Sequence, residues 1–93
     1  MRTIEATSQF KRDYKREAKG AHRDVLQNDF PTLLKTLASD QPLPEKHRDH
    51  GLTGEWKDHR DCHVKPDLVL IYRKLEANVL QLVRLGSHSE LGL

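Results

Sequence analysis

The fold of this chain is decided by residues 61–86, which read DCHVKPDLVLIYRKLEANVLQLVRLG. Residues 68–74 are apolar at both odd and even positions, which is typical of a central strand covered on both faces. Residues 65–67 predict a turn before this strand, and residues 76–78 predict a turn after it. A further strand over 79–85 then follows, so we expect consecutive hairpins and an antiparallel sheet.

Upstream of this stretch the sequence predicts a short strand and a first helix. Residues 3–6 alternate weakly, as a strand would. Thr7 or Ser8 then offers an N-cap oxygen for a helix, and Gly20 supplies the permissive conformation that ends it. The apolar residues of this helix recur every four positions, at Phe10, Tyr14 and Ala18.

A second helix is predicted over 25–37, with Pro31 in its middle. Because proline removes a helix hydrogen bond, the helix either kinks there or restarts with Asn28 or Asp29 as a new cap. The prolines of 41–44 stop it, and a turn-rich loop follows. Trp56 and Lys57 then begin a strand that continues over 61–64, after an irregularity at Asp58 and His59.

The predicted order is therefore β-α-α-β-β-β. This is an α+β fold, in which a small, twisted, mainly antiparallel sheet packs against two N-terminal helices. A chain of 93 residues, 35% of them hydrophobic, has room for one lean core, so we expect a single domain over 1–93.

Composition indicates a cytoplasmic protein. Cys62 is the only cysteine, which excludes an internal disulfide and favours a reducing compartment. Residues 1–10 lack the apolar run of a secretory signal. The longest apolar run, 68–72, is far too short to span a membrane. We expect no membrane association.

Basic residues concentrate in the first helix and just after it. Residues 11–23 hold six basic side chains against two acidic ones, in a chain whose net charge is only +2. Such a cluster attracts phosphate or an acidic protein, although it is equally typical of a solvated helix face. The basic residues are Lys11, Arg12, Lys15, Arg16, Lys19 and Arg23.

Polar side chains converge on one end of the predicted sheet. Asp61 and His63 point to the face opposite Cys62 and Val64, because side chains alternate along a strand. Hairpin pairing places Asp67 near the end of the last strand, where His88 follows. His50 can reach the same place from its loop.

Two kinds of chemistry fit these residues. Three histidines and an aspartate are credible metal ligands, but the usual zinc spacings are absent, so we expect no metal and no cofactor. Cleavage of RNA by its own 2′-hydroxyl is the better fit, since histidine can accept or donate a proton at neutral pH. Arg60, Arg84 and Lys57 are candidates for holding the phosphate.

Some of these polar residues also have purely structural interpretations. Arg84 could pair with Asp61 or Asp67, and Trp56 favours a core or loop-anchoring role over base stacking. Cys62 is expected to face the core. His22, His47 and His59 are expected to be solvated.

Several motifs resemble the YafQ family of the RelE toxin superfamily, in register from about Ile4 to Leu91. They are Pro42-Leu-Pro44, Asp49-His50-Gly-Leu52, Gly54-Glu-Trp56-Lys57, Arg60-Asp61-Cys-His63-Val64, Pro66-Asp67, Leu70-Ile71-Tyr72 and Gly86-Ser-His88.

The resemblance implies an endoribonuclease toxin that cuts mRNA in the ribosomal A site and leaves a 2′,3′-cyclic phosphate. It implies His50, His63, Asp67 and His88 as the catalytic set. Asp67 and His63 would serve the 2′-hydroxyl and His88 the leaving group, although the reverse assignment stays open. His50 would stabilise the phosphate, and Asp61 would hold a neighbouring histidine or arginine.

The resemblance also implies partners. A cognate antitoxin would neutralise the toxin in a hetero-oligomer that binds operator DNA through the antitoxin, and the free toxin would be a monomer. The 70S ribosome and mRNA would be its targets. One departure matters: relatives often carry an aromatic residue where this chain has Gly92. A non-catalytic ribosome- or RNA-binding protein of the same fold is therefore the main alternative, and a metal-dependent hydrolase is the third.

Overall fold

The structure is a computed structural model that describes residues 1–76 and 78–93, so part of the predicted 76–78 turn lies outside the described residues. Its centre is a five-stranded sheet in the order β1-β5-β4-β3-β2. The strands are β1 (Thr3–Ala6), β2 (His50–Gly51), β3 (Arg60–Lys65), β4 (Leu68–Leu75) and β5 (Val79–Gly86). Only β1 runs parallel to its neighbour, β5, and the other pairs are antiparallel.

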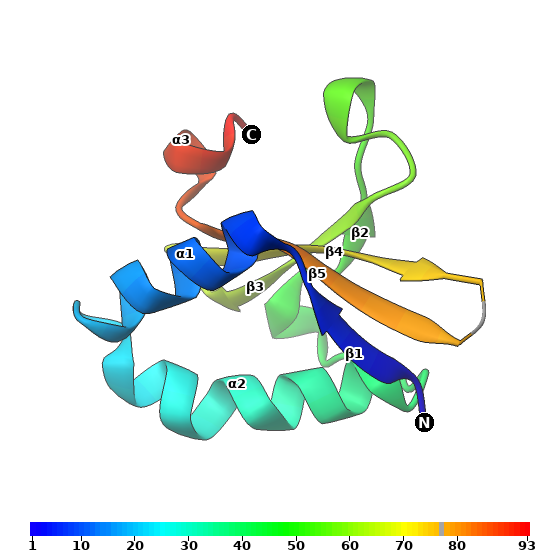
Figure 1. The fold of residues 1–93 in the computed structure, drawn as a ribbon, viewed down its shortest axis with the longest axis horizontal. Helices are drawn as coiled ribbons and strands as arrows, with labels where there is room; N and C mark the ends of the chain where they lie inside the picture. Colours follow the sequence, from blue (N-terminus) through cyan, green and yellow to red (C-terminus); the bar gives the residue numbers. More distant parts are fainter. Residues whose placement is uncertain (77) are drawn as a thin grey trace.

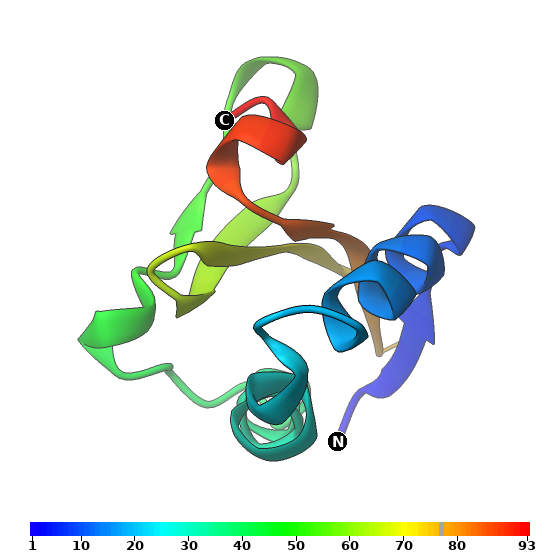
Figure 2. The same cartoon turned by 90° about the vertical axis from the view of Figure 1, so that its left-hand side faces the viewer.

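Helices cover both faces of this sheet. The long helices α1 (Ser8–Ala18) and α2 (Arg23–Ala38) pack on one face. The short helix α3 (His88–Leu91) and the 3-10 helix η2 (Gly54–Trp56) stand on the opposite face, as Figures 1 and 2 show. A second 3-10 helix, η1 (Glu45–His47), lies in the connection to β2. The predicted α+β fold is confirmed.

The two faces of β4 explain why its first five residues, 68–72, are apolar at both odd and even positions. Leu68, Leu70 and Tyr72 are buried in the main core against α1 and α2. Val69 and Ile71 are buried in a smaller cluster with Leu91 of α3. The prediction of a central strand covered on both faces is therefore confirmed.

Pro31 neither ends nor restarts the second helix. Helix α2 runs through it from Arg23 to Ala38, so the predicted alternative of a break there is wrong. Apolar residues on both sides of the proline hold the helix against the core, which offsets the lost hydrogen bond. They are Leu26, Phe30, Leu33 and Leu37.

Two local predictions are corrected. Helix α1 ends at Ala18, and the N–H groups of Lys19 and Gly20 donate to carbonyls of its last turn without Gly20 taking a left-handed conformation. Trp56 does not begin a strand, because it belongs to η2. Asp58 has a left-handed φ of 68°, and β3 starts only at Arg60.

In the described part of the chain, no helix is long and apolar enough to cross a membrane.

Candidate active site

Three histidines from different elements meet above the sheet. His63 on β3 pairs with Val69, and Val69 pairs with Gly86, so the register carries His88, the first residue of α3, across β4 toward His63. The two imidazole centroids lie 4.8 Å apart. Together with His50, Arg48 and Asp49 they line one open cavity of about 550 Å³, which we call the histidine cavity. The sequence prediction that these histidines gather is confirmed.

Asp61 lies beneath this cluster and is almost fully buried, with 1% of its surface exposed. Its Oδ1 is 2.9 Å from His50 Nδ1, because the two residues are register partners on β2 and β3. The same nitrogen is hydrogen-bonded to the carbonyl of Arg48 at 2.9 Å. Among the described residues, the buried Oδ1 of Asp61 accepts no hydrogen bond of good geometry, so this ion-pair contact with His50 is its polar interaction.

The cluster shifts the pKa values of two of its members. Burial raises the pKa of Asp61, and the charges of His50, His63 and His88 only partly oppose this shift. Burial and the charge of His88 lower the pKa of His63 below 6.5, while Asp61 acts in the opposite direction. His63 therefore favours the neutral form at pH 7, the form in which it can accept a proton.

Asp67 is at the predicted end of the sheet, but its carboxylate does not join the histidine cavity. The side chain is 76% exposed, and Oδ2 lies 3.2 Å from Nε2 of His22. Nδ1 of His22 lies 2.8 Å from Glu17 Oε1. The expectation that His22 is simply solvated is wrong, because both nitrogens of its ring face carboxylates.

Three of the predicted phosphate-binding cations are engaged in ion pairs, namely Arg84, Arg16 and Arg60. Nε of Arg84 donates to Asp13 at 2.8 Å, so its structural partner is neither Asp61 nor Asp67. Arg16 contacts Asp13, Glu17 and Glu90. Arg60 lies 3.3 Å from Asp49. The other predicted cations are exposed and take part in none of the salt bridges between described residues; they are Lys11, Arg12, Lys15 and Lys57.

Asp13 is the residue that the sequence analysis missed most clearly. It is fully buried and also accepts from the backbone N–H of Leu85 at 3.0 Å. Its position three residues after Phe10, on the packed side of α1, was the available signal. Arg16 then links Asp13 to Glu90, whose carboxylate closes a capping box with Ser87 next to His88. The Ser-x-x-Glu spacing of that box was also readable from sequence.

The predicted placements of Cys62 and Trp56 agree with the structure, whereas those of His47 and His59 as simply solvated do not. Cys62 is buried in the main core. Trp56 anchors its loop, because Nε1 donates to the carbonyl of Leu91 at 3.3 Å and the ring packs in the cluster under α3. Neither His47 nor His59 is free in solvent: their Nδ1 atoms bond the carbonyls of His63 and Lys57. Within residues 1–76 and 78–93, no group of three or more potential ligands is arranged to hold a metal ion.

Comparison with known proteins places this chain in a class. Residues 2–92 match the family described as bacterial toxin of type II toxin–antitoxin system, YafQ. An mRNA interferase toxin YafQ from Escherichia coli is 41% identical over 91 residues, covering 97% of this chain and 95% of that protein.

Solved structures of toxins from two bacteria have the same fold as this chain. A metal-bound toxin from Helicobacter pylori superposes with a TM-score of 0.84 at 46% identity, covering 98% of this chain and 99% of that one. The toxin chain of an Escherichia coli DinJ–YafQ complex gives 0.82 at 39% identity and covers 98% of each chain. Fold and sequence together define a toxin of a type II toxin–antitoxin system. Within that class, the chain belongs to the YafQ family of the RelE superfamily.

Proposed function

We propose that this protein is an mRNA interferase, which inhibits translation by cutting mRNA in the ribosomal A site. The observation that carries the proposal is the pairing of His63 and His88 beside Arg48 in one open cavity. Two imidazoles and a guanidinium are what cleavage by the 2′-hydroxyl needs. One ring accepts the hydroxyl proton, the other protonates the departing 5′-oxygen, and the cation holds the phosphate charge.

The catalytic set that we propose is His50, His63, Asp67 and His88. His63 accepts the 2′-hydroxyl proton, since its lowered pKa keeps it neutral. His88 protonates the leaving oxygen, while His50, held between Asp61 and the Arg48 carbonyl, faces the phosphate. For Asp67 to assist His63, its carboxylate must leave His22, so that contact bears directly on the mechanism.

The phosphate is held by Arg48, Arg60 and Lys57 in this proposal. Arg84 and Arg16 keep the structural roles that their contacts with buried Asp13 give them. The exposed cations of α1 provide a surface for ribosomal RNA. In the resting cell an antitoxin covers the toxin, as DinJ is bound to YafQ in the Escherichia coli complex.

The experiment that tests the proposal is cell-free translation with purified protein, in which new mRNA 5′ ends are mapped by primer extension. We expect cuts confined to translated codons for the wild type and for Ser89→Ala, a matched control beside the site. His88→Ala should produce none. Excess EDTA should leave cleavage unchanged, and cleavage that needs added zinc would overturn the metal-free mechanism.

A non-catalytic ribosome-binding protein is the second candidate, favoured by Gly92. This residue ends α3 with a left-handed φ of 71° and offers no aromatic side chain. Wild-type protein that binds ribosomes but leaves mRNA intact would establish this alternative.

A further inference from the structure

Two side chains of helix α1 hold the end of β5. Buried Asp13 accepts the backbone N–H of Leu85 at 3.0 Å, and Nη2 of Arg16 donates to the carbonyl of the same residue, also at 3.0 Å. Arg16 and Asp13 contact each other as well, at 3.2 Å. Both polar groups of the Leu85 backbone are therefore fixed to one turn of α1, three residues before His88.

The carboxylate of Asp13 keeps its charge although it is fully buried. Burial acts to raise its pKa, but hydrogen bonds from Arg84, from the backbone of Leu85 and from Gln9 outweigh burial and lower the pKa. Moving this carboxylate would leave several buried partners unpaired, which is costly. Asp13 is therefore a fixed anchor for Arg16.

From this anchor Arg16 reaches helix α3. Its Nη2 lies 3.3 Å from Oε2 of Glu90. The other oxygen, Oε1, accepts the backbone N–H of Ser87 at 3.0 Å, and the Ser87 hydroxyl accepts the N–H of Glu90 at 3.2 Å. This reciprocal pair is the capping box of α3, and the first residue after its N-cap is His88.

Helix α3 depends on such contacts because it is only four residues long. A helix this short is not stable by itself, so its orientation is set by what holds its two ends. Leu91 holds the C-terminal end, since its side chain is buried over β4 and its carbonyl accepts from Trp56. The N-terminal end is held by the ion pair of Arg16 with Glu90.

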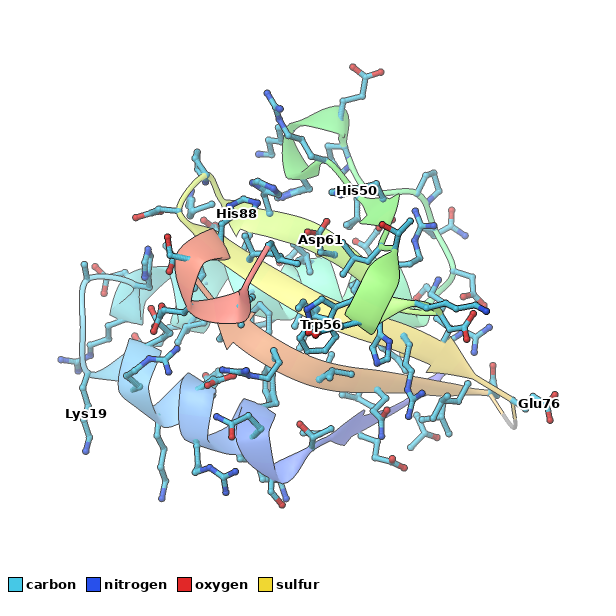
Figure 3. All side chains as sticks on the ribbon, turned by 90° about the horizontal axis from the view of Figure 1, so that it is seen from above. Lys19, His50, Trp56, Asp61, Glu76 and His88 are labelled. Carbon is cyan, nitrogen blue, oxygen red and sulfur yellow. The ribbon has the colours of Figure 1, made fainter. Side chains whose placement is uncertain are left out.

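The N-terminal end of α3 determines where the imidazole of His88 lies. The centroid of this ring is 4.8 Å from that of His63, and both rings line the histidine cavity. Figure 3 shows His88 on α3, on the same side of the sheet as His50 and Asp61. A shift of the first turn of α3 would therefore change the distance between the two proposed proton-transfer groups.

We infer that Arg16 and Glu90 are positioning residues, whose ion pair, anchored on Asp13, holds His88 against His63. Neither Arg16 nor Glu90 lines the histidine cavity, so both act through the backbone of residues 85–88. The consequence for cleavage rests on the proposed function, in which His88 protonates the leaving oxygen.

The test compares two single variants with their combination. Glu90→Gln can still close the capping box with Ser87, because glutamine serves at this position, but it loses the charge that attracts Arg16. Arg16→Lys keeps the positive charge of α1 but loses the planar fork that reaches Leu85 and Glu90 together. Because the two residues act as one unit, the double variant should show no more than the larger of the two single effects.

Two NMR measurements on the intact protein report the position of His88 without any cleavage. The nuclear Overhauser cross-peak between the rings of His63 and His88 reports their proximity. The pH titration of His63 reports the charge beside it, because burial and the charge of His88 lower its pKa. We expect each variant to weaken the cross-peak and to raise the pKa of His63 toward 6.5. The other charged groups around His63, namely Asp61, Arg48 and His50, stay in place.

Cleavage is measured beside these signals. Single-turnover rates on the ribosome should fall about tenfold in each variant, since a small displacement of a reacting group slows the chemical step. Ribosome binding should stay unchanged, because Arg16→Lys keeps its charge and Glu90→Gln removes no cation.

Arg2→Lys is the matched control, because Arg2 holds the other end of β5 in a similar way. It pairs with Asp40 at 2.8 Å and donates to the carbonyls of Leu75 and Val79, at the end of β4 and the start of β5. Its replacement should destabilise the fold but leave the signals of both histidines unchanged. If Arg16 served stability alone, the two lysine variants would behave alike.

Each outcome separates the inference from the proposed function. Wild-type histidine signals in Glu90→Gln, whatever its cleavage rate, would overturn the positioning role and leave the nuclease standing. Effects that add in the double variant, or a wild type without the cross-peak, would also overturn this role. Displaced histidine signals together with a wild type that cuts no mRNA would overturn the nuclease and leave the ion pair as the support of His88. If Arg16→Lys does not fold, Glu90→Gln decides, since its side chain is 42% exposed.

Discussion

The imidazole of His22 lies between two carboxylates: Nε2 is 3.2 Å from Asp67 Oδ2, and Nδ1 is 2.8 Å from Glu17 Oε1. This ring joins the connection between α1 and α2 to the turn between β3 and β4. Burial of the ring opposes its protonation, but the hydrogen bonds that it donates to Glu17 and Asp67 outweigh burial and raise the pKa of His22 above 6.5.

The stability that His22 contributes should therefore depend on pH. When folding raises the pKa of a group, the group stabilises the fold fully at pH values below its pKa in the unfolded chain. This contribution is lost as the pH rises through its pKa in the folded protein. His22→Gln should cost on the order of 1 kcal/mol near pH 5.5 and much less near pH 8.5. Urea unfolding at both pH values measures this, with His59→Gln as control. An equal cost at both would contradict it.

A larger loss of stability is expected from Asp13→Ala. The carboxylate is fully buried and accepts from Arg84 and from the backbone N–H of Leu85. Removing it leaves a guanidinium and a buried N–H without their partner, which costs about 3 kcal/mol. Urea unfolding followed by circular dichroism checks this. Asp24→Ala, on the exposed side of α2, should change the free energy of unfolding by less than about 0.5 kcal/mol.

Sequence patterns predicted the elements whose cause is local. Apolar residues at both odd and even positions of 68–74 identified the central strand, and the spacing of Phe10 and Tyr14 identified α1. The parallel pairing of β1 with β5 was not predicted, because it depends on contacts between chain ends that no local pattern encodes. Pro31 misled the helix prediction because core packing outweighed local preference.

The site was predictable to the extent that strand register fixes it. Hairpin pairing was enough to bring His63 and His88 together. It was not enough to orient Asp67, because the side chain of this turn residue is held by His22, which lies in the connection between α1 and α2. Register places a backbone, whereas the partner of an exposed side chain depends on which distant elements pack beside it.

Gly86→Ala should disturb the site more than the fold. A Cβ at Gly86 would lie 3.1 Å from Arg16 Nη2 and 3.2 Å from Glu90 Oε1, so both flexible side chains must shift. That shift weakens the ion pair and the capping box that hold the start of α3, where His88 lies. We expect less than about 1 kcal/mol of destabilisation, but slower mRNA cleavage and a changed NMR signal of His88. Gly20→Ala, whose nearest contact is an ordinary 3.7 Å, is the matched control.

The pH dependence of cleavage should follow His63. Burial and the charge of His88 lower its pKa below 6.5, and Asp61 opposes them. If His63 is the base, cleavage is lost only as the pH falls below about 6.5. Asp61→Asn should move this loss of cleavage to still lower pH, because the Asp61 charge that raises the pKa of His63 is gone. Single-turnover cleavage rates at saturating ribosomes measure the pH at which cleavage is lost. This pH should not change for Glu55→Gln. If Asp61→Asn instead lost cleavage at a higher pH than the wild type, His63 would be excluded as the base.

The exposed cations of α1 give the last prediction. Lys11 and Lys15 are exposed on successive turns and take part in none of the salt bridges between described residues. If they bind ribosomal RNA, Lys11→Ala with Lys15→Ala should weaken ribosome binding, most at low salt. The slope of log affinity against log salt should become shallower by about one for each phosphate that these lysines neutralise. Lys35→Ala with Lys46→Ala removes the same charge elsewhere and should have little effect. Equal weakening by both pairs would mean that only net charge matters, and unchanged binding for both would assign the α1 surface to solvent or to the antitoxin.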